Sequence, residues 1–142
     1  MTQIPPILQM NSASHHFPAR LTSLSEVLAH ITAICKQAGL KNDEQLRVEL
    51  AVEELFTNTV RHGYGQDSDQ SVWIAADNNN GSLCITYQDA APAYNPLERP
   101  TDRIPPPIGG LGVTLIENFA HTRYLHENGR NTLILTFLSA PD

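Results

Sequence analysis

The sequence is short of charge, and the charge it has is mainly acidic. Only 17% of its 142 residues are charged and the formal net charge is -6, whereas about 25% of residues are charged in an average soluble domain. With 41% hydrophobic residues, the chain is neither a disordered acidic tail nor a coiled coil. A nucleic-acid binder needs clustered Lys and Arg against phosphates, so we expect no direct nucleic-acid contact.

Long hydrophobic runs and cysteine are also scarce. No stretch approaches the ~18 consecutive apolar residues of a membrane span, and the first ten residues carry no basic group. We therefore expect a cytoplasmic protein with no membrane contact. Cys35 and Cys84 lie in apolar patterns, which favours small buried thiols over the alternative of a disulfide. The histidines, His15 and His16 included, lack metal-ligand spacing and are expected at the surface or in packing, with a zinc site as the alternative.

The length is that of one domain, which we expect to cover residues 1–142 with a flexible N-terminus over 1–11. Prolines are concentrated in one place, because six of the ten lie between Pro92 and Pro107. This predicts a stiff loop over 90–108. A loop of that length inside a compact domain is more often functional than not.

Two amphipathic helices are predicted in the first half of the chain. Apolar residues recur at helical spacing over 24–38, with Thr22 or Ser23 as a possible N-cap and Gly39 after the end. A second helix runs to about His62.

The second helix has Asn42 or Asp43 as its expected cap, and Gly63 and Gly65 end it. Its expected buried stripe is Val48, Ala51, Val52, Leu55, Phe56 and Thr59.

Strand patterns follow, arranged as two hairpins. The expected strands are 71–77, 82–88, 122–127 and 131–138. Asn-rich residues 78–81 join the first pair, and Asn128-Gly129 joins the second, since Asn and Gly tolerate positive φ. A helical run over 113–121 lies between the hairpins, and 13–19 is a possible further strand. These elements predict an α+β fold: a two-layer sandwich whose mixed, mostly antiparallel sheet has helices on one face.

One polar stripe borders the apolar face of the second helix. Glu54, Asn58 and His62 are spaced i, i+4, i+8 and share a face. A carboxylate and a carboxamide oxygen suit a hard cation such as Mg²⁺, and Glu can accept a proton. The alternative is the solvated polar edge that amphipathic helices ordinarily carry.

Two further motifs have a functional and a plain interpretation. Gly109-Gly110-Leu111-Gly112 opens a helical run, so its backbone N–H groups and the helix dipole suit a phosphate. The alternative is a tight turn entering a helix. Asp89, at a strand end, suits the exocyclic amine of a base, and the alternative is a turn-initiating Asp.

Taken together, these motifs resemble the ATP-binding domains of the GHKL superfamily, which includes histidine kinases and type II topoisomerases. Within it the sequence is most similar to the anti-sigma-factor serine/threonine kinases. LAVEELFTNTVRHGYG (50–65) resembles the N-box helix, with Glu54 and Asn58 at its E-x-x-x-N positions. DAAPAYNP (89–96) resembles the D-x-G-x-P-F-x-P box, GGLGVTLIENF (109–119) the glycine box, and GRNTLILTF (129–137) the final hairpin.

The resemblance implies the GHKL sandwich and assigns roles at an ATP site. Glu54 would be the general base that activates the attacking hydroxyl, and Asn58 would ligate Mg²⁺. Asp89 would accept a hydrogen bond from the adenine amino group. Thr132 would support the adenine edge, and His62 would lie near the phosphates.

Three glycine-box residues, Gly110, Leu111 and Gly112, would present backbone N–H groups to the phosphates, and the 97–108 part of the 90–108 loop would be a lid.

The middle box departs from the family pattern. Ala91 stands where the family has Gly, in the wall of the cofactor site, Ala93 replaces a proline, and Tyr94 replaces Phe. A methyl at 91 either fits or strains the backbone, at a cost of about 1–3 kcal/mol.

The leading functional hypothesis is a cytoplasmic protein kinase that uses ATP and Mg²⁺. It would phosphorylate an anti-sigma factor antagonist of the STAS-domain type and bind a sigma factor, with a homodimer as the open alternative to a monomer. The alternative is a non-catalytic partner-binding module with weak or lost ATP binding. The catalytic domain of a histidine kinase is disfavoured, because no phosphoacceptor helix precedes residue 20.

Overall fold

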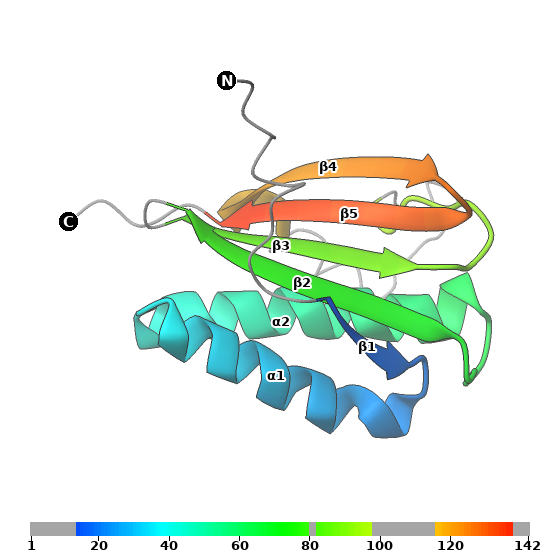
Figure 1. Ribbon diagram of the computed structural model, residues 1–142, viewed down its shortest axis with the longest axis horizontal. Coiled ribbons are helices and arrows are strands. Elements are labelled where there is room, and N and C mark those ends of the chain that lie inside the picture. Colours follow the sequence, from blue (N-terminus) through cyan, green and yellow to red (C-terminus); the bar gives the residue numbers. More distant parts are fainter. Residues whose placement is uncertain (1–13, 80–81, 98–115, 138–142) are drawn as a thin grey trace, which may run out of the picture.

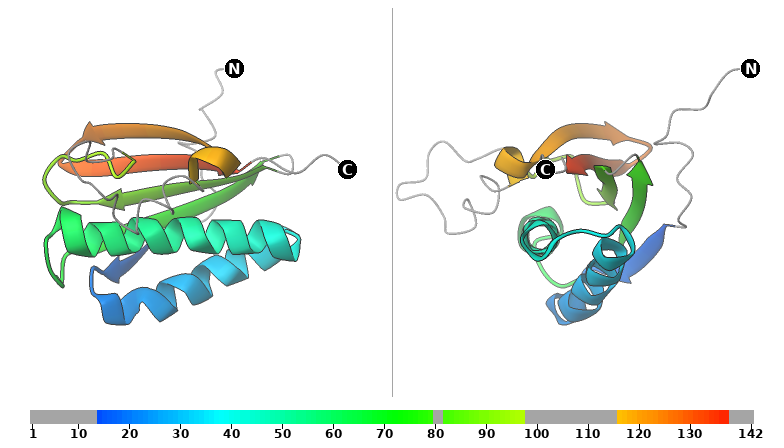
Figure 2. Two further views of the ribbon diagram at one scale, coloured as in Figure 1. Left: turned by 180° about the vertical axis from the view of Figure 1, so that it is seen from behind. Right: turned by 90° about the vertical axis from the view of Figure 1, so that its left-hand side faces the viewer.

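The computed structural model describes residues 14–79, 82–97 and 116–137. Within these ranges five strands form one antiparallel sheet in the order β1-β2-β3-β5-β4. Two helices pack on one face of this sheet (Figure 1), and an end-on view shows the sheet curving over them (Figure 2). The strands are β1 (His15–Pro18), β2 (Ser71–Asn79), β3 (Ser82–Asp89), β4 (Ala120–Glu127) and β5 (Arg130–Phe137). The predicted two-layer α+β sandwich is confirmed.

Helix α1 (Leu24–Gln37) follows a short 3₁₀ turn, Leu21–Ser23. Ser23 occupies the N-cap position, one of the two residues predicted for it, although its side chain makes no capping hydrogen bond. The fully buried side chains of α1 recur at i, i+4, i+8, which turns one face of the helix into the core. They are Val27, Ile31 and Cys35.

Helix α2 (Asn42–Asn58) begins earlier than its expected cap allows. Lys41 is the N-cap residue, so the predicted capping by Asn42 or Asp43 is wrong. The Glu44 carboxylate accepts a hydrogen bond from the Lys41 backbone N–H at 2.9 Å, which satisfies an N-terminal donor from inside the first turn. All six residues of the predicted apolar stripe are buried.

The α-helical part of α2 ends at Asn58 rather than near His62. A π-helical turn, Thr59–Gly63, carries the chain on, and the Tyr64 N–H donates to the Thr59 carbonyl, five residues back, at 2.8 Å. The wider turn adds a residue and breaks the i, i+4, i+8 spacing beyond Asn58. His62 is exposed.

Both predicted hairpins are present, and the turn of the second one, at residues 128–129, explains why it forms. Asn128 and Gly129 have φ values of 55° and 73°, the conformation that a two-residue turn between twisted strands requires. The 13–19 segment supplies β1, which pairs with β2. Of the helix predicted over 113–121, residues 113–115 lie outside the described residues and 116–119 are helical. Ala120 and His121 are not helical, because they pair with β5.

Strand alternation separates the two faces of the sheet. Leu83, Ile85 and Tyr87 of β3 are buried toward the helices. Cys84 lies on the opposite face and is half-buried, so the expected burial holds fully only for Cys35, and both thiols are free. This periodicity decides which strand residues can reach the helical layer.

Some predicted features fall outside the described residues. They are the 1–11 terminus, the 98–108 part of the loop and the glycine cluster at 109–112. The first part of the loop, 90–97, is described, and it packs against the ends of β3 and β5.

Candidate functional site

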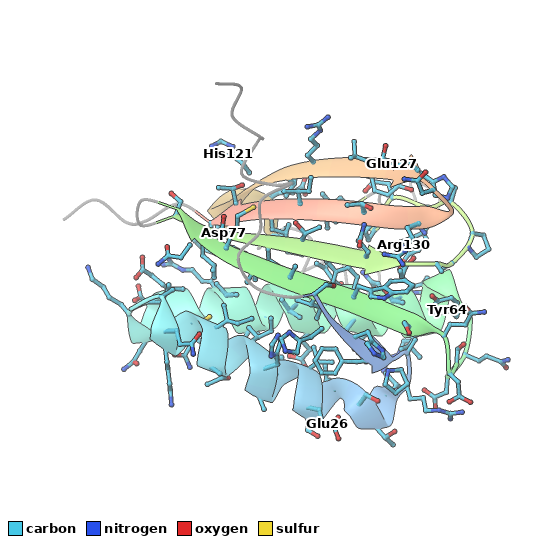
Figure 3. All side chains as sticks on the ribbon, viewed as in Figure 1. Glu26, Tyr64, Asp77, His121, Glu127 and Arg130 are labelled. Carbon is cyan, nitrogen blue, oxygen red and sulfur yellow. The ribbon has the colours of Figure 1, made fainter. Side chains whose placement is uncertain are left out.

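The candidate site is at one end of the sandwich, where β3 ends and β5 begins. Asp89, the last residue of β3, is opposite Asn131 of β5. Tyr64, Glu127 and Arg130 mark this end of the molecule, whereas Asp77 and His121 mark the other (Figure 3). The π turn at the end of α2 reaches the same place, because Thr59 bonds to Asp89.

Asp89 is the centre of a buried hydrogen-bond network, with 2% of its surface exposed. Its Oδ1 accepts from Asn131 Nδ2 at 2.9 Å and from the Ala91 N–H at 3.2 Å. Its Oδ2 accepts from Thr59 Oγ1 and from the Tyr94 hydroxyl, each at 2.9 Å. A buried carboxylate is tolerated only with partners of this kind.

Thr59 and Tyr87 connect Asp89 to the helical layer. Their hydroxyl oxygens are 2.6 Å apart, and the Tyr87 hydroxyl donates to the Leu55 carbonyl at 3.2 Å. Burial raises the pKa of Tyr87 well above its ordinary value, so this phenol keeps its proton. The network thereby fixes the end of α2 against β3.

Tyr94 is held from both its side chain and its backbone. Its N–H donates to Asn131 Oδ1 at 3.1 Å, and its hydroxyl donates to Asp89. Burial raises the pKa of Tyr94, and the charge of Asp89 raises it further. The phenol is therefore a proton donor at any physiological pH.

Gly63 makes room for this arrangement. A Cβ at Gly63 would lie 3.0 Å from the Tyr94 hydroxyl, 3.1 Å from Tyr94 Cε1 and 3.2 Å from the Ala91 methyl. Ala91 itself is buried and has no positive φ. Its methyl is thus accommodated without the backbone strain that the sequence left open, since the glycine faces it.

Glu54 and Asn58 form a second polar pair on α2, one helical turn before the π turn. Asn58 Nδ2 donates to Glu54 Oε1 at 3.5 Å, and both side chains are half-buried. Desolvation raises the pKa of Glu54, and the repulsion of Glu53 adds to it, whereas the Asn58 hydrogen bond and the attraction of Arg61 lower it. Glu54 is therefore a stronger base than a solvated glutamate.

The structure assembles part of the predicted site. Asp89 and Ala91 bond to each other, and the Glu54–Asn58 pair directly precedes Thr59. Other predicted residues do not join them. His62 is exposed on the π turn.

Thr132 is separated from Asp89 by strand parity. It pairs with Gln88 and accepts a hydrogen bond from Gln88 Nε2 at 2.9 Å on the opposite face of the sheet. The predicted phosphate ligands Gly110, Leu111 and Gly112 lie outside the described residues.

Sequence reasoning missed Asn131, Tyr94 and Gly63 as members of the site. Parity identifies Asn131, because it shares its face of β5 with the buried Leu133 and Leu135. The same parity places Thr132 on the opposite face of the sheet, where it is also buried. Tyr94 belongs to the 89–96 box, but its contact with Gly63 gave no local signal, since it joins segments about thirty residues apart.

Two negative findings apply to the parts of the chain that the structure describes. They contain no group of three or more His, Cys, Asp or Glu side chains able to hold a metal ion. No helix in them has the length and apolar character needed to cross a membrane.

Comparison with known proteins now identifies the family. The sequence profile of the histidine kinase-like ATPase domain matches residues 17–137. The chain belongs to the histidine kinase-like ATPase family. Similar proteins named anti-sigma F factor occur in Heyndrickxia coagulans, 29% identical over 115 residues (77% of this chain, 78% of that protein), and in Halalkalibacterium halodurans, 30% identical over 104 residues (68% and 71%). The Bacillus subtilis anti-sigma F factor is 26% identical over 111 residues (73% and 76%). The resemblance predicted from the motifs is confirmed.

Solved structures share the fold of this ATPase-family chain. A Mycobacterium tuberculosis chain holding RsbU and RsbW domains gives a TM-score of 0.60 at 20% identity, covering 89% of this chain and 32% of its own. This chain thus spans about a third of that one. The histidine kinase domain of a blue-light activated kinase from Erythrobacter litoralis gives 0.52 at 15% identity, covering 91% and 70%. At these identities the likeness shows the fold alone.

Proposed function

We propose that this chain is an ATP-dependent anti-sigma regulator that phosphorylates an anti-sigma factor antagonist. The observation that carries the proposal is the Glu54–Asn58 pair on α2. Thr59, the residue that follows Asn58, bonds to the buried carboxylate of Asp89 at the end of β3. Membership of an ATPase family and relatives named anti-sigma F factor support it.

Asp89 is the proposed recognition group for the adenine base. It is buried, it accepts hydrogen bonds on both oxygens, and it sits where β3, β5 and the end of α2 converge. A base amine is a donor, so a buried acceptor discriminates adenine from bases that present a carbonyl there. The predicted role of Thr132 at the adenine edge passes to Asn131 in this proposal, because Asn131 touches Asp89.

Asn58 fits a magnesium ion by its donor chemistry. The amide nitrogen of Asn58 donates to Glu54, so the amide oxygen takes no part in that hydrogen bond. Amide and carboxylate oxygens are the ligands that Mg²⁺ takes in proteins. When bound, the ion supplies charge neutralisation for the phosphates.

Glu54 is the proposed general base for the transfer. The antagonist's hydroxyl oxygen bonds to the γ-phosphorus of ATP, the bond from that phosphorus to the β–γ bridging oxygen breaks, and ADP leaves. The hydroxyl proton passes to the Glu54 carboxylate, whose desolvation raises its pKa and so its basicity. The Asn58 hydrogen bond orients that carboxylate.

A second candidate function is a non-catalytic partner-binding module. One observation favours it: Asn131, the Ala91 N–H and Tyr94 already donate to Asp89, so a nucleotide base would have to compete with them. Tight binding of a sigma factor with no transfer to any antagonist would select this function over the kinase.

The test is transfer of radiolabelled γ-phosphate from ATP and Mg²⁺ to a purified STAS-domain antagonist. Glu54→Gln is expected to slow transfer by about 10²–10⁴-fold while ATP still binds, because only proton transfer is lost. Glu53→Gln is the matched control, since it removes the neighbouring carboxylate of α2 and should leave transfer at neutral pH unchanged. Equal rates for Glu54→Gln and the parent protein would refute Glu54 as the base.

A further inference from the structure

Tyr94 contacts Asp89 in the way that a nucleotide base is proposed to contact it. Its hydroxyl donates to Asp89 Oδ2 at 2.9 Å, and an adenine amino group would donate to the same carboxylate. Tyr94 comes from the 90–97 segment rather than from the sheet or a helix, and its side chain is only partly buried. It is therefore the partner of Asp89 that can reach solvent without unfolding an element.

Both oxygens of Asp89 have hydrogen-bond partners in this arrangement. An ionised carboxylate offers about four lone-pair positions. Two donors approach Oδ1, namely Asn131 Nδ2 and the Ala91 N–H. Two approach Oδ2, namely Thr59 and Tyr94. A base amine that approaches Oδ2 therefore competes with the donors already there, and Tyr94 is one of them.

Three of the four donors are fixed by other contacts. Asn131 Nδ2 also donates to the Ala91 and Pro92 carbonyls at 3.1 and 3.2 Å. The Ala91 N–H belongs to the backbone. Thr59 is fully buried in the π turn, where its hydroxyl also lies 2.6 Å from that of Tyr87. The Tyr94 hydroxyl contacts Asp89 Oδ2 and, at 3.2 Å, Thr59 Oγ1, so moving this side chain away breaks no backbone hydrogen bond.

Packing makes the position of Tyr94 specific. The phenol lies against the backbone of Gly63, since a Cβ there would come within 3.0 Å of its hydroxyl and 3.1 Å of its Cε1. The ring thus fills the space between the π turn and the Asp89 carboxylate. Any group that binds Asp89 from this side must take the place of the ring.

We propose that Tyr94 is an internal ligand of Asp89 that competes with the nucleotide base, so that its displacement sets the affinity for ATP. This inference rests on the proposed function, because it takes Asp89 as the base-recognition group. The apparent affinity is then lowered by the fraction of molecules in which Tyr94 occupies Asp89. A change that weakens only the Tyr94 contact raises that affinity.

The experiment measures binding of ATP with Mg²⁺ by titration calorimetry to the full chain. Tyr94→Phe keeps the ring but removes the donor, and Tyr94→Ala also vacates the space beside Gly63. We expect Tyr94→Phe to tighten binding about tenfold, the equivalent of one hydrogen bond to a charged group. Tyr94→Ala should tighten it at least as much.

Tyr64→Phe is the matched control. It removes a phenol hydroxyl at the same end of the molecule, one that accepts from the Ala90 N–H and donates to the Ser71 carbonyl instead of bonding to Asp89. Its ATP affinity should equal that of the parent protein. Circular dichroism confirms that each variant is folded before titration.

A second readout follows Tyr94 directly. ATP binding should produce a tyrosine difference absorbance in the parent protein, because the partly buried phenol of Tyr94 leaves the Asp89 carboxylate and moves into water. The same difference should be absent from Tyr94→Phe. This signal does not depend on catalysis or on the antagonist.

The outcomes separate the two proposals. Tighter binding by both Tyr94 variants, or binding by them alone, supports the internal ligand. Equal affinity in parent and Tyr94 variants overturns it and leaves the proposed ATP binding intact. Binding by neither parent nor variants overturns both, since no base then competes for Asp89.

Discussion

At the scale of single residues, Asp89 organises the candidate site because it is both charged and buried. No buried side-chain nitrogen or oxygen in the described ranges lacks a hydrogen-bond partner. A buried acceptor that loses a donor costs more than the average hydrogen bond contributes, because the desolvation penalty remains. Loss of a residue that donates to Asp89 should therefore lower the free energy of unfolding more than loss of a polar residue elsewhere on the sheet.

Variants of two neighbouring residues of β5 test this difference in the free energy of unfolding. Asn131→Ala removes a donor from Asp89 and should lower the free energy of unfolding by about 1–3 kcal/mol. Thr132→Val removes only the acceptor for Gln88 on the opposite face and should cost about 1 kcal/mol or less. Urea unfolding of the two variants measures both. Similar losses would contradict the assignment of Asn131, rather than Thr132, to the site.

The pKa of Glu54 makes a prediction about pH. A general base must be unprotonated, so phosphotransfer should rise with pH through a pKa above the ordinary glutamate value and then level off. Arg61 lowers this pKa and Glu53 raises it. Arg61→Gln should therefore move the acid limb to higher pH, and Glu53→Gln should move it to lower pH.

Initial transfer rates across the acid range measure these shifts. The opposite directions serve as controls for each other, because general damage to the fold would not move one limb up and the other down. Shifts of the same sign in both variants would show that Glu54 does not govern the profile.

At the scale of elements, the π turn after α2 is where the structure departs from the regular helix that the sequence periodicity predicts to about His62. The turn gives an extra residue between Asn58 and Tyr64, and it brings Gly63 against Tyr94 and Ala91. Single π turns inside helices are frequent at functional sites. Here the turn joins the Glu54–Asn58 pair to the Asp89 network.

Gly63→Ala should disrupt this junction. The new methyl would lie 3.0 Å from the Tyr94 hydroxyl, and overpacking of this kind should lower the free energy of unfolding by about 1–3 kcal/mol. In a Tyr94→Ala background the loss should shrink, since the space is then vacant. A double-mutant cycle by urea unfolding measures this coupling, and additive losses would count against the contact.

Hydrophobic period and turn chemistry predicted most elements of the fold. The apolar stripe of α2, the two hairpins and the end of α1 before Gly39 all follow from local patterns. The errors occur where local preference competes with pairing. Ala120 and His121 continue a helical pattern but form β4, because their backbone groups pair with Phe137 and Thr136.

At the scale of the whole molecule, the sheet, α2 and the 90–97 segment converge at one end of the sandwich. A nucleotide bound there, as proposed, would contact groups from several segments that are distant in sequence. Such a ligand stabilises the folded state, because the unfolded chain does not bring those groups together.

ATP with Mg²⁺ should therefore raise the free energy of unfolding of the chain by about 2.7 kcal/mol at a hundred times its dissociation constant. The melting temperature at increasing ATP concentration measures this. Asp89→Ala should abolish the rise, whereas Asp77→Ala, at the opposite end of β2, should retain it. A rise that persists in Asp89→Ala would place the nucleotide elsewhere.

The sequence alone determined the composition of the two layers and named Glu54, Asn58 and Asp89, because helical spacing, strand alternation and turn residues are local properties. Tertiary structure alone decided which side chains meet. Strand register put Asn131, not Thr132, beside Asp89, and the π turn put Gly63 beside Tyr94. Such contacts join segments far apart in the chain, and their geometry depends on register and on one added residue, which no local pattern encodes.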